Sequence, residues 1–246
     1  IELLLKVLDL NPEHSDAKSN AKQTCNEFGI ILHREGEYKS ALKYFEKVIA
    51  LAPAEYFGYF NMGNTYFELK DFKNAKEYIK KALQFEPNHE PAHANLGEVY
   101  RTQGEFEKVF RCYNEAIKIN PKNPNNYYNI AITFNEVGQQ DKAEKNYKKA
   151  TSIDPKHIES HHNLALLYEE RGQINEALNV VKKAYKLDKR HPKLNFALGM
   201  ITLKLGNYKE GWHYYDYRWK KSPQNKVIRP FQGKPLWKGE RGKRVA

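Results

Sequence analysis

The sequence predicts an all-α fold, an α-α superhelix of six full helical hairpins preceded by a partial one. Three observations support this prediction. The same residue pattern returns every 34 positions without insertion or deletion, apolar residues follow helical spacing within each repeat, and glycine and proline recur where helices would end. The six repeats span residues 22–55, 56–89, 90–123, 124–157, 158–191 and 192–225.

The first helix of each repeat is predicted from its seventh, eighth and eleventh positions. The seventh residue is always apolar, and the eleventh is apolar in five of the six repeats. The eighth residue is always small, namely Gly29, Gly63, Gly97, Ala131, Ala165 and Gly199. Apolar residues at this spacing indicate an amphipathic helix, and the small residue among them lets a second helix approach closely.

A turn and a second helix follow in each repeat. Glycine at the fifteenth position suits the left-handed conformation that ends a helix, and Lys70 is the one departure. The second helix carries small contact residues at the twentieth and twenty-seventh positions, including Ala41, Ala75, Ala143, Ala177, Ala82, Ala116, Ala150 and Ala184. Proline cannot continue a helix, and it closes five repeats at Pro53, Pro87, Pro121, Pro155 and Pro223.

The two ends depart from this pattern. Residues 1–21 are expected to form the second helix of a partial preceding repeat and a connector, so that the chain opens inside a repeat. Pro12 and Pro53 lie 41 residues apart rather than 34, and the extra seven residues correspond to about two helical turns. The next first helix should therefore begin early, near Ser15. Residues 226–246 are expected to be a basic junction or the start of a C-terminal domain.

These residues make the chain resemble the tetratricopeptide repeat family, whose unit is a helix-turn-helix of about 34 residues. The resemblance covers residues 22–225. It implies a protein-binding solenoid in which the second, fifth, sixth, ninth, twelfth and thirteenth positions of each repeat face the concave surface.

Asparagine occupies the sixth position of four successive repeats, at Asn61, Asn95, Asn129 and Asn163. A carboxamide both donates and accepts, so it can pair with the backbone of a peptide whatever its side chains. The arrangement resembles the asparagine ladder of the O-linked N-acetylglucosamine transferase, which implies binding of an extended polypeptide. Alternatively, these asparagines only satisfy helix ends or water.

Other side chains are expected to flank the ladder on the same face: Phe60, Asn64, Tyr128, His162 and Phe196. Aromatic residues, and acids such as Glu68 and Glu98, favour a protein ligand, because a polyanion would require a track of Lys and Arg. Asn64 fits the pattern of repeats that grip acidic peptide ends, but the basic partners are missing from the neighbouring repeats.

The positive charge of the chain is concentrated at its C-terminal end. The net charge is +11, and residues 218–246 hold ten Lys or Arg against one acid. The repeats are therefore nearly neutral, and nucleic acid is not an expected partner. Trp212, Tyr215 and Trp219 form an aromatic stripe on the last helix, and with Trp237 they are expected to dock another domain. The alternative is that residues 226–246 fold back as a cap.

A second resemblance concerns this end. Gly211-Trp212, Arg218-Trp219 and the run Trp237-Lys238-Gly239-Glu240 are similar to the junction at which bacterial tetratricopeptide proteins continue into a glycosyltransferase-like domain. The resemblance implies that the repeats recruit polypeptide substrate for a C-terminal catalytic domain that uses a nucleotide sugar. The alternative is a stand-alone scaffold that assembles a protein complex and makes a basic C-terminal contact.

No catalytic or cofactor site is predicted within this chain. Residues 89–93 match the H-E-x-x-H string of zinc enzymes, but the string straddles a repeat boundary, so no metal is expected. Phosphate-binding loops and nucleophile elbows are missing from the sequence. Cys25 and Cys112 lie two repeats apart and are expected to be buried thiols, which suits a reducing, cytoplasmic setting. No stretch is apolar enough for a membrane span.

Overall fold

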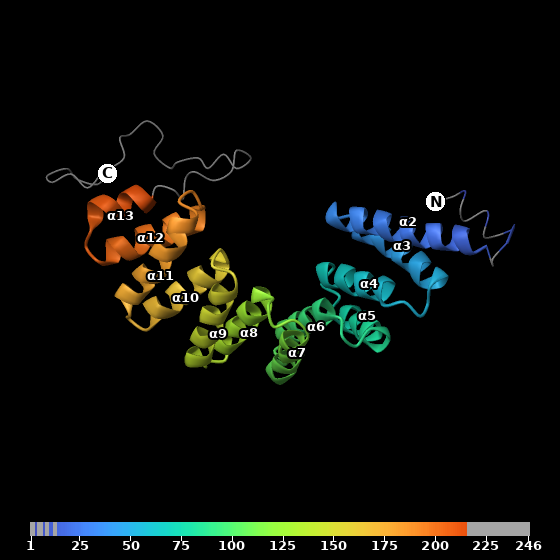
Figure 1. Cartoon of the computed structure of the whole chain (residues 1–246), viewed down its shortest axis with the longest axis horizontal. Helices are drawn as coiled ribbons and strands as arrows, with labels where there is room; N and C mark the ends of the chain where they lie inside the picture. The colour runs from blue at the N-terminus through green and yellow to red at the C-terminus, as the bar shows by residue number, and fades with distance from the viewer. Residues whose placement is uncertain (1–2, 4–6, 8–9, 12–13, 216–246) are drawn as a thin grey trace, which may run out of the picture. The chain divides into compact units, whose positions relative to one another are not determined.

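The computed structural model describes residues 3, 7, 10–11 and 14–215, and the described residues form twelve α-helices and no strand (Figure 1). The all-α prediction is confirmed. The helices are α2 Ser15–Arg34, α3 Tyr38–Leu51, α4 Tyr56–Glu68, α5 Phe72–Phe85, α6 Glu90–Thr102, α7 Phe106–Ile119, α8 Pro124–Glu136, α9 Gln140–Ile153, α10 Ile158–Glu170, α11 Ile174–Leu187, α12 Pro192–Lys204 and α13 Tyr208–Tyr215. Several predicted features lie wholly or mainly outside the described residues: the helix within residues 1–12, the side chains Trp219 and Trp237, and the segment 226–246.

Successive helices pair into hairpins, and the hairpins belong to two compact units. The N-terminal unit extends to Pro121 and contains α2 to α7, and the C-terminal unit begins at Lys122 and contains α8 to α13. Within each hairpin the two helices pack side by side, and the first helices of neighbouring hairpins also touch within a unit. Each unit therefore presents one face made of first helices.

The helix ends follow from local chemistry. α2 begins at Ser15, as the seven extra residues of the first repeat predicted. The carboxylate of Asp71 caps α5 by accepting from the backbone N–H of Asn74 at 3.1 Å. Five glycines that end first helices have φ between 71° and 83°, and Lys70 takes the same left-handed conformation at 60°. The predicted caps are confirmed, including the departure at Lys70.

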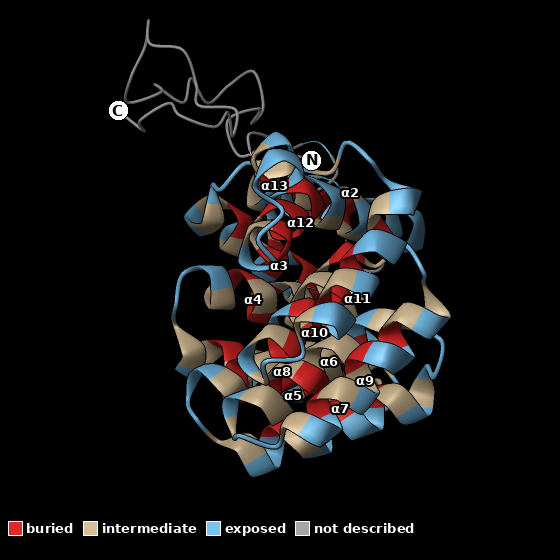
Figure 2. Ribbon diagram, turned by 90° about the vertical axis from the view of Figure 1, so that its left-hand side faces the viewer, coloured by how far each residue is buried: buried red, intermediate tan, exposed pale blue. Residues whose placement is uncertain are grey.

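The core of the N-terminal unit lies between the helices of its hairpins, where the buried residues gather (Figure 2). Ala41, Phe45 and Met62 form one cluster, against which partly buried residues such as Leu32 pack. Gly29 is needed there, because a Cβ atom at this position would lie 2.6 Å from the Phe45 ring.

The core of the C-terminal unit is a larger cluster with the same origin. Tyr147, Leu164, Val181 and Leu198 are almost fully buried in it, together with the small contact residues of α8 to α12. Alanine at Ala165, where other repeats have glycine, is accommodated in this core.

The two cysteines are free thiols in the N-terminal unit, and both are buried as predicted. Burial raises the pKa of Cys112 to about 11. Among the described helices, none is long and apolar enough to cross a membrane.

Candidate functional site

The asparagines of the N-terminal unit connect the first helices of successive repeats. Nδ2 of Asn61 on α4 donates to Oδ1 of Asn26 on α2 at 2.8 Å, and Nδ2 of Asn95 on α6 donates to Oδ1 of Asn64 on α4 at 2.8 Å. Each bond uses one N–H of the predicted ladder residue. Among the described residues, the second N–H and the carbonyl oxygen of Asn95 have no other partner, so both can pair with a ligand.

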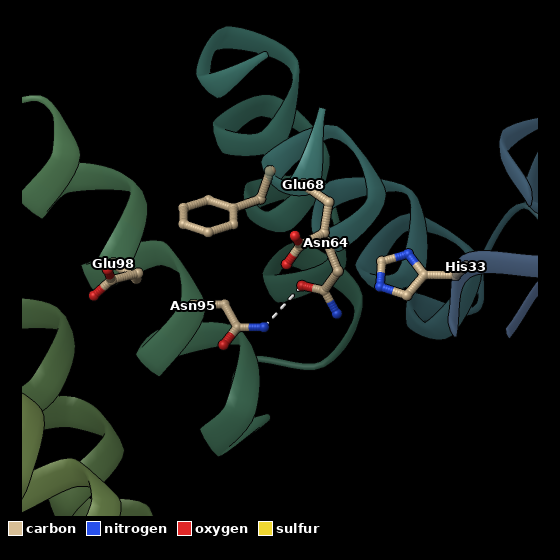
Figure 3. A pocket seen from close by; sticks show the side chains of 6 residues that line it. His33, Asn64, Glu68, Asn95 and Glu98 are labelled. Carbon is tan, nitrogen blue, oxygen red and sulfur yellow. Dashed lines mark hydrogen bonds between the residues drawn. The ribbon is translucent and has the colours of Figure 1, made fainter. Parts of the chain in front are cut away.

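A cavity of about 300 Å³ opens on this face, lined by side chains from three successive first helices. The lining residues are His33, Asn64, Phe67, Glu68, Asn95 and Glu98. Figure 3 shows the Asn64 and Asn95 pair, with the carboxylate of Glu68 beside Asn64. The cavity thus combines amides, carboxylates, an imidazole and an aromatic ring.

The two carboxylates of the cavity have different surroundings. Glu98 accepts hydrogen bonds from Nε and Nη2 of Arg101 at 3.0 and 2.5 Å, and from the hydroxyl of buried Tyr113 at 3.3 Å. Desolvation is the main cause that raises the pKa of Tyr113, and the nearby Glu98 charge adds to it. Glu68 is exposed, and within the described part of the chain it has neither an ion pair nor a hydrogen bond from its side chain.

His33 forms the opposite wall of the cavity. Its Nδ1 lies 3.0 Å from Oγ1 of Thr65, whose hydroxyl is also within 2.7 Å of the Asn61 carbonyl oxygen. Burial lowers the pKa of His33, and the smaller effect of Glu68 opposes it. At neutral pH the imidazole is therefore uncharged.

The C-terminal unit places its two ladder asparagines on α8 and α10. Nδ2 of Asn163 donates to the hydroxyl of Tyr128 at 3.4 Å, which brings together one ladder residue and one predicted flanking residue. Asn129 is half-buried, and its backbone carbonyl accepts from the Thr133 hydroxyl at 3.1 Å. The binding role of all four asparagines stays a prediction.

Two predicted flanking aromatics pack on a histidine that precedes the next first helix. The Phe60 ring lies 4.6 Å from the His89 ring, and the Tyr128 ring lies 5.1 Å from the His157 ring. The two pairs occupy the same positions of their repeats. These aromatics therefore support the junction between hairpins as well as the first-helix face.

The remaining predicted residues lie near the end of the described chain. Phe196 on α12 is partly exposed, and its ring stacks on Tyr215 of α13 at 5.3 Å. Trp212 meets Tyr215 edge to face, also at 5.3 Å. His162 is half-buried on α10, and desolvation lowers its pKa. The structure thus joins a predicted peptide-face residue, Phe196, to the predicted docking stripe.

The two histidines of the H-E-x-x-H string contact different groups. His89 packs on Tyr56 and Phe60, with both ring centroids 4.6 Å away, whereas Nε2 of His93 lies 2.8 Å from the Pro87 carbonyl oxygen. No group of three potential metal ligands comes together within the described residues.

Every residue that lines the cavity occupies a concave position implied by the family resemblance. His33 and Phe67 are at the twelfth position, Glu68 is at the thirteenth, and Asn64 and Glu98 are at the ninth. The sequence placed Phe67 among the aromatic neighbours of the ladder, but His33 was absent from the predicted face. Extending the list of concave positions to the first repeat would have included it.

Family models match most of the repeat region. Residues 56–89 and 23–55 match models described as tetratricopeptide repeat, residues 97–138 match one described as TPR repeat, and residues 136–216 match one described as anaphase-promoting complex, cyclosome, subunit 3. A comparison with curated proteins finds no match.

Several solved structures share the fold. PilF of Pseudomonas aeruginosa has a TM-score of 0.71 at 13% identity, over 82% of this chain and 92% of its own. MamA has a TM-score of 0.59 at 24% identity, over 70% of this chain and 94% of its own. YrrB, described as a TPR protein with an unusual peptide-binding site, has a TM-score of 0.58 at 20% identity, over 83% of this chain and 97% of its own.

Proposed function

Because this chain is a tetratricopeptide repeat protein, we propose that it binds an extended polypeptide on the first-helix face of its N-terminal unit. The observation that carries the proposal is the cavity to which α2, α4 and α6 each contribute side chains. Asn61 and Asn95 on this face pair with the peptide backbone. Asn129 and Asn163 make equivalent contacts on the first-helix face of the C-terminal unit.

Three features support a peptide rather than another ligand. The remaining N–H and carbonyl oxygen of Asn95 match the alternating groups of an extended backbone. The lining is partly aromatic and carries carboxylates, which disfavours a polyanion. YrrB, which shares the fold, is itself described as having a peptide-binding site.

Selection of displayed random-sequence peptides on the full chain, followed by fluorescence anisotropy with the selected peptides, tests this function. One net hydrogen bond contributes about 0.5–1.5 kcal/mol, so Asn95→Ala should weaken binding about two- to tenfold. Asn61→Ala should weaken it to a similar extent.

Asn74→Ala is the matched control. Nδ2 of Asn74 on α5 donates to Asp71 at 2.6 Å, so this variant loses an equivalent side-chain bond on a second helix, away from the cavity. Its peptide affinity should equal that of the wild type. Failure to select any peptide, or equal affinity of the wild type and Asn95→Ala, would contradict the proposed function.

A finer proposal is that these repeats recruit polypeptide substrate for a glycosyltransferase domain that follows Ala246 and uses a nucleotide sugar. Its support is the motif around Trp212 and the run at 237–240, most of which lies outside the described residues. Reading the coding sequence after codon 246 tests it, and a stop codon there would favour the stand-alone scaffold. The free thiols Cys25 and Cys112 support a cytoplasmic location, which imaging of a tagged chain tests.

A further inference from the structure

The cavity between α2, α4 and α6 is lined, among the described residues, by acidic but not by cationic side chains. Two carboxylates line it, and none of its lining residues among the described part of the chain is Lys or Arg. His33 adds no positive charge at neutral pH, because burial lowers its pKa. A ligand group placed here therefore meets carboxylates and no cation among the described lining side chains.

The negative charge is concentrated at Glu68. Arg101 balances the charge of Glu98 through two hydrogen bonds, and Tyr113 adds a third. Glu68 makes no such bond with any described residue, although it shares the cavity. A carboxylate in this state can accept a charge-assisted hydrogen bond from a ligand without breaking an existing one.

The other lining groups suit a long side chain with a charged end. The Phe67 ring is held edge to face on Phe72, at 5.6 Å between centroids, and offers an apolar surface to an alkyl stem or a planar cation. The carbonyl oxygen of Asn95 is a further acceptor, because its bond to Asn64 uses only an N–H. Both groups favour Lys or Arg over a small polar residue.

The size of the cavity limits its occupant. At about 300 Å³ it is at the lower end of the range for small-molecule sites, about 300–1,000 Å³. A single side chain fits this volume better than a folded surface. An acidic peptide end is disfavoured because its charge would approach two carboxylates.

We propose that this cavity receives a Lys or Arg side chain of the bound polypeptide, with Glu68 pairing its charge and Phe67 packing on its stem. The inference rests on the proposed peptide-binding function and specifies which residue the peptide must carry. The peptide backbone lies over the Asn64 and Asn95 pair, and the basic side chain points toward Glu68.

Two small probes test the cavity without any selected peptide. The full ¹⁵N-labelled chain is titrated with N-acetyl-arginine-N-methylamide and with the citrulline analogue, which has a similar shape but no charge. The arginine probe should shift the side-chain amide signals of Asn64 and Asn95. It should also bind about fivefold more tightly than the citrulline probe, the discrimination that a part-exposed ion pair supports.

Glu68→Gln should abolish the preference for arginine. Glu170→Gln is the matched control, because Glu170 occupies the same repeat position on α10 and lies outside the cavity. It should leave the preference intact. Equal binding of the two probes, or a preference that survives Glu68→Gln, would overturn the inference.

The two proposals fail in different ways. If the selected peptides depend on Asn95 for binding but contain no excess of Lys or Arg, the proposal of a basic side chain in the cavity is wrong and the peptide-binding proposal stands. If no peptide is selected, the proposed peptide-binding function is contradicted. The probe titration would still measure the charge preference of the cavity.

Discussion

Lys70 occupies a position that suits glycine. It is the one described non-glycine residue with positive φ, and it ends α4 as Gly104 ends α6. A side chain in the left-handed region costs about 1–2 kcal/mol because Cβ crowds the following carbonyl oxygen. Lys70 is exposed, so its side chain offers little packing to offset this cost.

Lys70→Gly should therefore raise the free energy of unfolding by about 1 kcal/mol, since part of the gain is lost to the greater freedom of glycine in the unfolded chain. Urea denaturation followed by circular dichroism measures the change. The reciprocal variant Gly104→Lys, at φ 71°, should lower stability by a similar amount. A Lys70→Gly protein no more stable than the wild type would refute the argument.

Single residues also mark the limit of prediction from the sequence. The repeat period identified Asn95 and Asn64 as residues of one face, but their mutual hydrogen bond depends on rotamers and on the offset between α4 and α6. Arg101 follows Glu98 at helical spacing, so this ion pair was visible in the sequence. The hydrogen bond from Tyr113 to Glu98 joins α7 to α6, and the sequence alone did not indicate it.

At the scale of helices, the small residue at the eighth position controls how closely a hairpin closes. A Cβ atom at Gly63 would lie 2.5 Å from Cγ1 of Ile79 and 3.0 Å from its backbone nitrogen. A Cβ atom at Gly97 would meet ring atoms of Tyr113 at 3.2 Å. Backbone of a packed helix cannot move as easily as a ring, so the two hairpins should respond differently to the same substitution.

Gly63→Ala should lower the free energy of unfolding by about 2 kcal/mol, because overpacking costs about 1–3 kcal/mol. Gly97→Ala should change it by less than about 1 kcal/mol, since the ring can shift and alanine favours a helix by about that amount. Urea unfolding of both variants provides the comparison. Equal losses in the two proteins would show that the close approach at Ile79 does not matter.

The helices themselves were largely predictable, because glycine or proline marks the helix ends in most repeats. The early start of α2 at Ser15 followed from the seven extra residues alone. How closely the two helices of each hairpin approach was not predictable, since either glycine or alanine can occupy the eighth position without changing the period. The cavity depends on that approach, so its lining emerged only from the arrangement of α2, α4 and α6.

Both units contain buried or half-buried histidines. Desolvation lowers the pKa of His33 and His89 in the N-terminal unit, and of His161 and His162 in the C-terminal unit, below the ordinary value of 6.5. At a pH below 6.5, these histidines bind protons more readily in the unfolded chain than in the folded chain. Stability must then fall as the pH falls through about 6.5, and the loss ends below the pKa values of the folded state.

Thermal unfolding should consequently show a lower melting temperature at pH 5.5 than at pH 7.5. A loss of 1 kcal/mol corresponds to about 2–4 °C for a chain of this length. Carboxylates such as Glu144, whose pKa is lowered mainly by a hydrogen bond from Lys148, add their own loss only at more acidic pH.

The matched comparison uses one buried and one exposed histidine. His161→Gln removes a titrating group that is 8% exposed, so the difference between the two melting temperatures should shrink even if the loss of its contact with Pro155 lowers both. His213→Gln, at an exposed position of α13, should retain the full difference. If His161→Gln keeps the wild-type difference, protonation of this buried imidazole does not contribute to acid unfolding, because only a group whose proton affinity changes on folding can make stability depend on pH.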